Sequence, residues 1–289
     1  MAIIKGSDWG GSRITTSQTC KQKYYLSYEA PHPDGGTGLI PIEDKVAPAK
    51  GTLIHVALQH YYEGLRVAPD AAKGPLIIQS IKAALDAIDS FEIPTELLPL
   101  MKDEIISALD QYFTKYSGST VDDLVPIEVE KPFNLQVGNL VHTGIIDLFA
   151  EWHDELFVVD HKTTSLRLDQ FFKKFRFDIS LMGYAKAKSD ELGRPVGVLI
   201  NGIRFKKDKA MTVELEREPI LYSPGELEEI FPKTILAERT AIDVCKDSSF
   251  WPKSGAQCVQ VWGDCEMRRM CIYNDPAMAK TFYKARSEI

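Results

Sequence analysis

The sequence predicts an α/β fold in which helices flank a mixed central sheet, and two observations support this. Helical apolar periodicity fills the first part of the chain, and three runs with strand character follow it. A helix and a further strand come next, and this order of elements is typical of an α/β core. The 289 residues, 44% of them hydrophobic and 26% charged, suffice for one large domain or for a domain with an added lobe.

The first part of the chain is predicted to be mainly helical. Hydroxyl side chains near its start favour a helix over 12–29, and the Pro- and Gly-rich segment 30–41 is a predicted loop. An apolar stripe at helical spacing indicates a helix over 51–65. Two further helices are predicted, at 75–90 and 95–117.

The strands are predicted where apolar residues concentrate between turn signals. They cover 125–133, 140–150, 155–163, 196–205 and 211–217. Two helices complete the pattern, one over 169–192 that ends at Gly193-Arg-Pro195, and one over 223–246 that begins at Ser223-Pro-Gly-Glu226.

Three charged residues interrupt two of these strands. Asp147 lies within the strand at 140–150, and Asp160 and Lys162 end the strand at 155–163. The side chains at 160 and 162 point to the same face because a strand has a period of two. Charges in buried strands need compensation, and a divalent cation such as Mg²⁺ or Mn²⁺ would provide it. The alternative is a buried ion pair of Lys162 with one of the acids, without chemistry.

Other polar residues become candidates because of their positions. His55 follows Gly51 by four residues on a predicted helix, where local sequence alone favours packing or a surface position. Glu128 and Glu130 point to one side of their strand. Ser180 and Tyr184 are four residues apart and share a helix face, so they can reach a phosphate together, although core packing of the tyrosine is the alternative.

The five cysteines are unevenly distributed. Cys20 lies alone near the start, whereas Cys258, Cys265 and Cys271 lie near the end, a pattern that indicates metal binding rather than disulfides in a cytosolic chain. Tight C-x2-C pairs, which zinc ribbons use, are lacking. The alternatives are reduced, unligated thiols and a zinc-stabilised lobe. Cys245 is predicted to be a buried free thiol.

Together these motifs resemble the PD-(D/E)XK nuclease superfamily, and among its members the RecB-like branch with AddB and the CRISPR-associated iron–sulfur exonucleases. The resemblance rests on five motifs in family order: Gly51-x-x-x-His55, Gly144-x-x-Asp147, Asp160-His161-Lys162, Ser180-x-x-x-Tyr184, and Cys20-Lys-Gln-Lys-Tyr24 with the three late cysteines. The chain departs from the family in three places. Serine replaces a glutamine at position 180, no proline follows Cys20, and an x6 spacing replaces the first C-x2-C step.

The resemblance implies a single nuclease domain over residues 1–289 with a restriction-endonuclease-like core. It further implies a helical insertion at about 66–120 and an iron–sulfur lobe formed by about 12–29 and 245–289. The implied metal ligands are His55, Asp147, Asp160 and the backbone carbonyl of His161. Lys162 would position or help deprotonate the attacking water, with Glu130 and Tyr184 beside it. Cys20, Cys258, Cys265 and Cys271 would hold an iron–sulfur cluster, expected to be 4Fe-4S.

The implied function is a Mg²⁺- or Mn²⁺-dependent DNA nuclease. We expect an exonuclease on DNA ends or single strands, acting in recombination, repair, or phage or CRISPR DNA processing, with a helicase or recombination protein as a partner. The alternative is a catalytically inactive DNA-binding or scaffold subunit. The net charge of −7 argues against coating of nucleic acid through bulk charge. Without a long apolar run or a signal peptide, the sequence predicts a cytoplasmic protein with no membrane span.

Overall fold

The computed structural model describes residues 10–43, 45–117, 124–206, 210–260 and 263–286. Two compact units make up the chain. The first, here called the cysteine unit, comprises Met1–Glu43, Gln136–Thr143 and Glu228–Ile289, and the second, the sheet unit, comprises Asp44–Leu135 and Gly144–Leu227. Within the described ranges no helix combines the length and apolarity that a membrane crossing requires.

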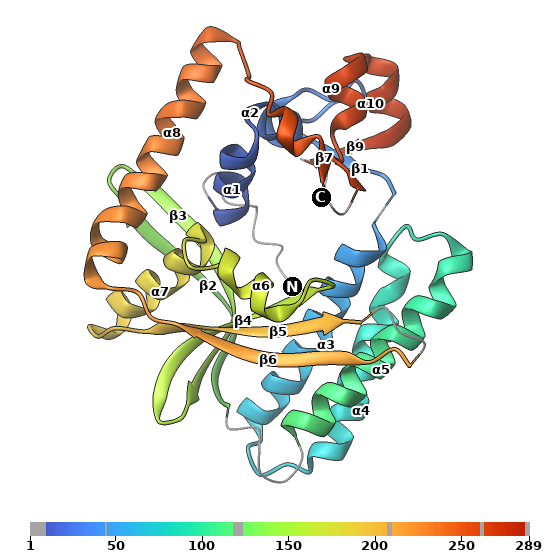
Figure 1. Cartoon of the computed structure of the whole chain (residues 1–289), viewed down its shortest axis with the longest axis vertical. Helices are drawn as coiled ribbons and strands as arrows, with labels where there is room; N and C mark the ends of the chain where they lie inside the picture. Colours follow the sequence, from blue (N-terminus) through green and yellow to red (C-terminus); the bar gives the residue numbers. More distant parts are fainter. Residues whose placement is uncertain (1–9, 44, 118–123, 207–209, 261–262, 287–289) are drawn as a thin grey trace. The chain divides into compact units, whose positions relative to one another are not determined.

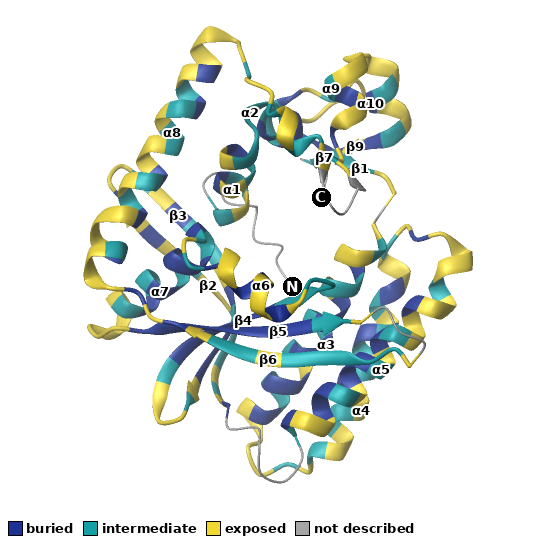
Figure 2. Cartoon of the chain, in the orientation of Figure 1, coloured by how far each residue is buried: buried dark blue, intermediate teal, exposed yellow. Residues whose placement is uncertain are grey.

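A mixed five-stranded sheet in the order β2-β3-β4-β5-β6 confirms the predicted α/β class. β4 pairs antiparallel with β3 and parallel with β5, and β5 pairs antiparallel with β6. β4 and β5 are buried over most of their length because they lie in the middle of the sheet (Figure 2). The strands are β2 (Val125–Val137), β3 (Leu140–Trp152), β4 (Glu155–Thr164), β5 (Gly197–Phe205) and β6 (Val213–Ile220).

One face of this sheet carries the main core, formed with three long helices (Figure 1). They are α3 (Val46–Val67), α4 (Lys73–Asp86), which continues into a 3-10 turn at Ala87–Ser90, and α5 (Leu98–Tyr116), which a 3-10 turn at Thr95–Leu97 precedes. The apolar stripe predicted for the first of them is fully buried against the alternate residues Phe157 and Val159 of β4. Because strand side chains alternate, Asp160 and Lys162 face away from this core.

The helix predicted at 169–192 covers the opposite face, but it is broken into pieces. α6 (Leu168–Phe171) and a 3-10 turn (Phe172–Lys174) come first, and α7 (Ile179–Leu192) then packs on β4 and β5. Asp178 caps α7 by accepting hydrogen bonds from the backbone N–H groups of Ser180 and Leu181. The break therefore places a new helix start, with an acidic cap, beside the ends of the central strands.

The cysteine unit joins both ends of the described chain. β1 (Leu39–Pro41) pairs antiparallel with β9 (Tyr283–Ala285) above a small core around Leu26, Met267 and Tyr283. Its remaining elements are α1 (Gly11–Thr19), α2 (Lys21–Tyr24), a π-helical turn (Tyr25–Glu29), a second π-helical turn (Glu226–Ile230) that begins in the sheet unit, α8 (Phe231–Ser248), a 3-10 turn (Gly255–Gln257), β7 (Val259–Gln260), β8 (Gly263–Asp264), α9 (Arg268–Tyr273) and α10 (Pro276–Phe282).

The predicted helix over 12–29 is interrupted at Cys20, which has extended backbone angles (φ −165°, ψ 119°). Its sulfur accepts a hydrogen bond from the N–H of Lys23 and so caps the short helix that follows. The break turns the thiol toward the chain that follows α8, where the N–H of Ser254 donates to the same sulfur. In a continuous helix, the thiol of Cys20 would project from the side of the helix and would not cap the turn that follows.

Candidate active site

The candidate site lies where β3 and β4 separate. Their antiparallel register extends from Trp152↔Glu155 to Leu148↔Val159 and stops there. Beyond it, the backbone N–H of His161 donates to the carboxylate of Asp147, at 3.1 Å, instead of to a neighbouring strand. The carboxylate therefore replaces a missing ladder bond, which fixes its position at the fork between the strands.

His55 reaches this fork from α3. A Cβ atom at Gly51 would lie only 2.9 Å from Oγ1 of Thr163, so the glycine allows α3 to pass close to the end of β4. One turn later, Nε2 of His55 lies 2.6 Å from the carbonyl oxygen of His161, and Nδ1 lies 3.3 Å from the carboxylate of Asp147. The spacing of Gly51 and His55 thus has a direct structural reason.

Asp160 and Lys162 form an ion pair on the same strand, with 2.6 Å between Nζ and Oδ2. Oδ2 is nevertheless a buried oxygen that lacks a well-directed hydrogen bond within the described part of the chain. Burial raises the pKa of Asp160, the Lys162 ammonium partly opposes this shift, and Asp147 adds to it. Burial alone would lower the pKa of Lys162, but the carboxylate of Asp160 raises it.

Glu130 and Tyr184 complete the acidic side of the site. Glu130 has a left-handed backbone (φ 48°), which is rare for a side chain other than glycine or asparagine within a strand. Burial, with a contribution from Asp147, raises its pKa to about 7. The pKa of Tyr184 is raised by burial and then by Asp160 and Asp147, so its hydroxyl stays protonated. Glu128, in contrast, forms an ion pair with the buried Lys188 of α7.

Gly144 gives Tyr184 the space to lie here. A Cβ at position 144 would come within 2.7 Å of the ring of Phe133 and within 3.1 Å of the ring of Tyr184. These two rings pack edge to face, with centroids 5.7 Å apart. Gly144, the glycine of the Gly144-x-x-Asp147 motif, is therefore required for packing.

A buried polar network beneath the site escaped the sequence analysis. Asn201, on β5, places its amide nitrogen 2.8 Å from Nδ1 of His161 and donates to the hydroxyl of Tyr112 at 2.9 Å. That hydroxyl lies 2.8 Å from the hydroxyl of Tyr62, whose ring stacks on the imidazole of His161. Burial lowers the pKa of His161 well below its usual value, so the ring is neutral. The available signal was a single asparagine in the otherwise apolar strand 196–203.

Asp178 was also missed. It contributes to the raised pKa values of both Lys162 and Tyr184, which places its charge near the site, while its Oδ1 caps α7. An acid at a helix start is a recognisable signal, but it lies within the range over which a single helix, 169–192, is predicted. Ser180, which stands where the family has glutamine, lies in the first turn of α7, directly after this cap.

The four cysteines assigned to a cluster all lie in the cysteine unit and influence one another. Burial raises the pKa of Cys271 to about 11, and Cys265, Cys20 and Cys258 add to this shift. Cys245 is 6% exposed and takes no part, as expected of a buried free thiol. In the described ranges, no three His, Cys, Asp or Glu side chains stand in an arrangement ready to hold a metal ion. The thiols therefore lie near one another without forming a preshaped site.

Comparison with known proteins assigns most of the chain to a family. A sequence model of the PD-(D/E)XK nuclease superfamily matches residues 9–272. Among solved structures, a candidate exonuclease from Eubacterium rectale is 13% identical, with a TM-score of 0.47 over 86% of this chain and 85% of its own. A protein called SSO0001 is also 13% identical, with a TM-score of 0.32 over 72% of this chain and 79% of its own. No curated protein matches this chain.

Proposed function

The chain belongs to the PD-(D/E)XK nuclease superfamily, and from this premise we propose that it hydrolyses phosphodiester bonds of DNA with the help of Mg²⁺ or Mn²⁺. One observation carries the proposal. The imidazole of His55 lies between two oxygens, the carbonyl of His161 and the carboxylate of Asp147. Two ring nitrogens and two oxygens, all of them capable of ligating a metal ion, are thus gathered at one point.

The chemistry of this donor set suits a divalent cation, although His55, Asp147 and Asp160 do not converge as a ready three-ligand site among the described residues. A carboxylate, a backbone carbonyl and an imidazole nitrogen are ligands that Mn²⁺ accepts, and Mg²⁺ prefers the oxygens among them. The buried and poorly satisfied Oδ2 of Asp160 adds a further oxygen on the same strand. His55, Asp147, Asp160 and the carbonyl of His161 would hold the ion, which would supply a water of lowered pKa and polarise the scissile phosphate.

The remaining side chains have separate tasks. Lys162 pairs with Asp160, and the resulting high pKa keeps the amine protonated, so it donates hydrogen bonds and positive charge to the phosphate. Glu130, with a pKa of about 7, holds or releases a proton near neutral pH. The protonated hydroxyl of Tyr184 is a further donor. Water attacks directly, so the reaction passes through no covalent enzyme intermediate.

Two finer parts of the proposal rest on the RecB-like motifs. We take the enzyme to be an exonuclease on DNA ends or single strands, and the four cysteines to hold an iron–sulfur cluster. The mutual effect of the four thiols on the pKa of Cys271 supports the second part. Sulfur ligands are those that such clusters use. The cluster would tie Cys20 to residues near the C-terminus and have a structural role.

A time course on end-labelled linear DNA and on circular single-stranded DNA tests the proposal, with Mg²⁺, Mn²⁺ or EDTA. We expect metal-dependent loss of the linear substrate while the circle survives. Cleavage of both substrates would make the enzyme an endonuclease and leave the nuclease function intact. If both substrates survived with either metal while the protein still bound them, the protein would be a catalytically inactive DNA-binding or scaffold subunit.

A further inference from the structure

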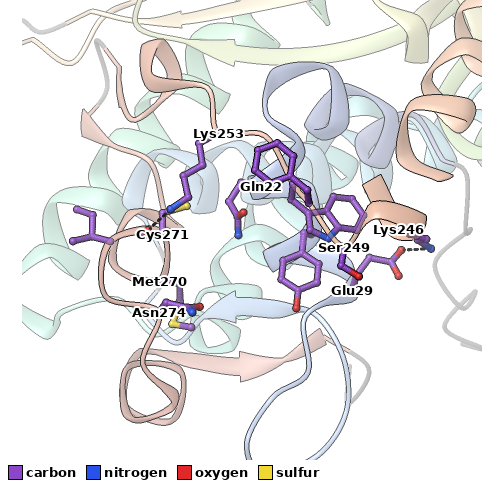
Figure 3. A pocket seen from close by; sticks show the side chains of 12 residues that line it. Gln22, Glu29, Lys246, Ser249, Lys253, Met270, Cys271 and Asn274 are labelled. Atoms are coloured by element: carbon purple, nitrogen blue, oxygen red, sulfur yellow. Dashed lines mark hydrogen bonds and ion pairs between the residues drawn. The ribbon is translucent and has the colours of Figure 1, made fainter. Parts of the chain in front are cut away.

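A pocket of about 910 Å³ lies within the cysteine unit, and the candidate metal site uses none of its residues. Cys271, one of the proposed cluster ligands, lines one end of it. The pocket forms directly after α8, where the left-handed backbone of Ser249 (φ 53°) turns the chain sharply. In Figure 3 the Lys246–Glu29 ion pair lies at one end of the pocket, Lys253 and Cys271 lie at the other, and Gln22 lies between them. This volume is within the range of small-ligand pockets, about 300–1,000 Å³.

Aromatic rings form a platform along the lining. Trp251 stacks on Tyr25, with centroids 5.1 Å apart and planes at 25°, and on Tyr24, at 5.9 Å and 23°. Tyr24 is only 1% exposed, so it anchors the stack in the interior. Phe250 precedes Trp251 and is 67% exposed, which leaves a large apolar ring in water. Phe250, Trp251 and Tyr25 all line the pocket, so a flat molecule in it would meet several aromatic rings.

The charges around this platform favour an anion at one end. Lys246 is neutralised by Glu29, at 3.0 Å. Lys253 instead donates to the carbonyl oxygen of Cys271, at 2.8 Å, so a neutral group rather than a carboxylate holds its ammonium at the pocket. The side chains of Gln22 and Asn274 add amide donors and acceptors to the lining. Rings, amides and a cation match the base and the phosphate of a nucleotide.

We propose that this pocket binds an unpaired nucleotide of single-stranded DNA, with the base on Phe250 and Trp251 and a phosphate at Lys253. A base within a duplex is already stacked on its neighbours, so only an unpaired base is free to use the platform. The inference deepens the proposed nuclease function by naming a second contact with the substrate.

Binding in EDTA separates this inference from catalysis, because no cleavage occurs without divalent metal. The probes are a labelled oligothymidylate and the same strand with abasic sites, and the measurements are fluorescence anisotropy and quenching of tryptophan fluorescence. We expect the intact strand to bind about tenfold more tightly than the abasic one, since stacking on an aromatic ring contributes on this scale. Phe250→Ala should remove most of that difference.

A matched control is Ile78→Ala, because Ile78 is 70% exposed but lies on α4 of the sheet unit. For the charge, Lys253→Ala should reduce the slope of log K against log salt by about 0.7, the effect of one contact with a single-strand phosphate. Lys233→Ala, on exposed α8, should leave the slope unchanged. The replaced side chains are exposed, so equal melting temperatures will show that the variants are folded.

Two results would overturn the inference: equal binding of intact and abasic strands by the parent protein, or Phe250→Ala indistinguishable from Ile78→Ala. Either result would leave the nuclease proposal standing if cleavage with Mg²⁺ or Mn²⁺ persists. Conversely, base-dependent binding lost in Phe250→Ala, in a protein that cleaves nothing, would support the pocket and count against the nuclease. The two proposals can therefore fail separately.

Discussion

The candidate metal site and the cysteine cluster hold their functional groups in different ways. In the sheet unit, Asp147, Asp160 and Lys162 lie within 16 positions of one another on paired strands, and strand register places them. In the cysteine unit, Cys20 and Cys258 are separated by most of the chain, and each lies between two short elements rather than within a sheet. Strand register therefore places the first set of groups, whereas the cysteines depend on how short segments pack.

This difference shows which region should depend on its cofactor for stability. The strands of the metal site belong to the main core with α3 and α5, and removal of the ion should leave that core in place. The core cluster beside the late cysteines is small: it has seven buried residues, and Cys265 and Cys271 pack against it. Cross-linking by a cluster would therefore contribute much of the stability of this unit.

The largest expected effect is on catalysis by the sheet unit. Asp160→Asn removes a charge but keeps the shape, so cleavage should fall at least about a thousandfold, because metal activation is worth several kcal/mol. Initial rates with Mn²⁺ and the melting temperature are the measurements. Asp190→Asn, the same change at an exposed site on α7, is the control and should cleave normally. Normal cleavage by Asp160→Asn would refute the site.

The next effect is on stability of the cysteine unit. Cys20→Ser keeps an acceptor for the N–H groups of Lys23 and Ser254 but removes a soft ligand. We expect loss of visible absorbance and of bound iron, and a loss of at least about 3 kcal/mol of unfolding free energy, the scale of a long-range cross-link. Absorbance and metal analysis of anaerobically purified protein measure the cluster, and denaturant unfolding measures the free energy of unfolding.

Cys245→Ala is the matched control, because Cys245 is buried in α8 away from the other thiols. It should retain the absorbance and the metal. If Cys20→Ser kept its iron and unfolded like Cys245→Ala, the cluster would be excluded from position 20. Zinc in place of iron in the parent protein would show that the lobe is zinc-stabilised.

The sequence predicts features set by local periodicity better than features set by contacts between distant segments. The strand period placed Asp160 and Lys162 on one face. The two predicted strands also pair, through a turn at His153 and Asp154, both with positive φ. In contrast, helical periodicity alone does not predict the breaks at Cys20 and Asp178, because each depends on a side-chain cap. The position of Cys20 depends in addition on Ser254, which is distant in sequence. The elements after residue 255 are short and have too little periodicity to predict.

The polar network beneath His161 should affect both stability and metal affinity, with an effect of intermediate size. Asn201→Leu removes the amide that contacts His161 and Tyr112, which should cost about 1–3 kcal/mol of stability. Because the carbonyl of His161 would then be held less firmly, the apparent affinity for Mn²⁺ should fall about 10–100-fold. Ile105→Val, in the same core, is a control for stability loss alone and should leave the Mn²⁺ affinity unchanged. Equal Mn²⁺ affinities in both variants would assign Asn201 to packing only.

The smallest expected effect concerns Glu130. Its raised pKa, about 7 in the folded protein, means that the folded state binds this proton more tightly than the unfolded chain does. Stability from this group is therefore complete below its ordinary pKa and is lost as pH rises to about 7. Without metal, Glu130→Gln should match the parent at low pH and melt about 2 °C higher above pH 7. Mg²⁺ should raise the melting temperature of the parent above pH 7 by compensating the carboxylate, and so reduce the difference between the two proteins. A difference in melting temperature that does not change with pH would show that the charge of Glu130 is already compensated without the ion.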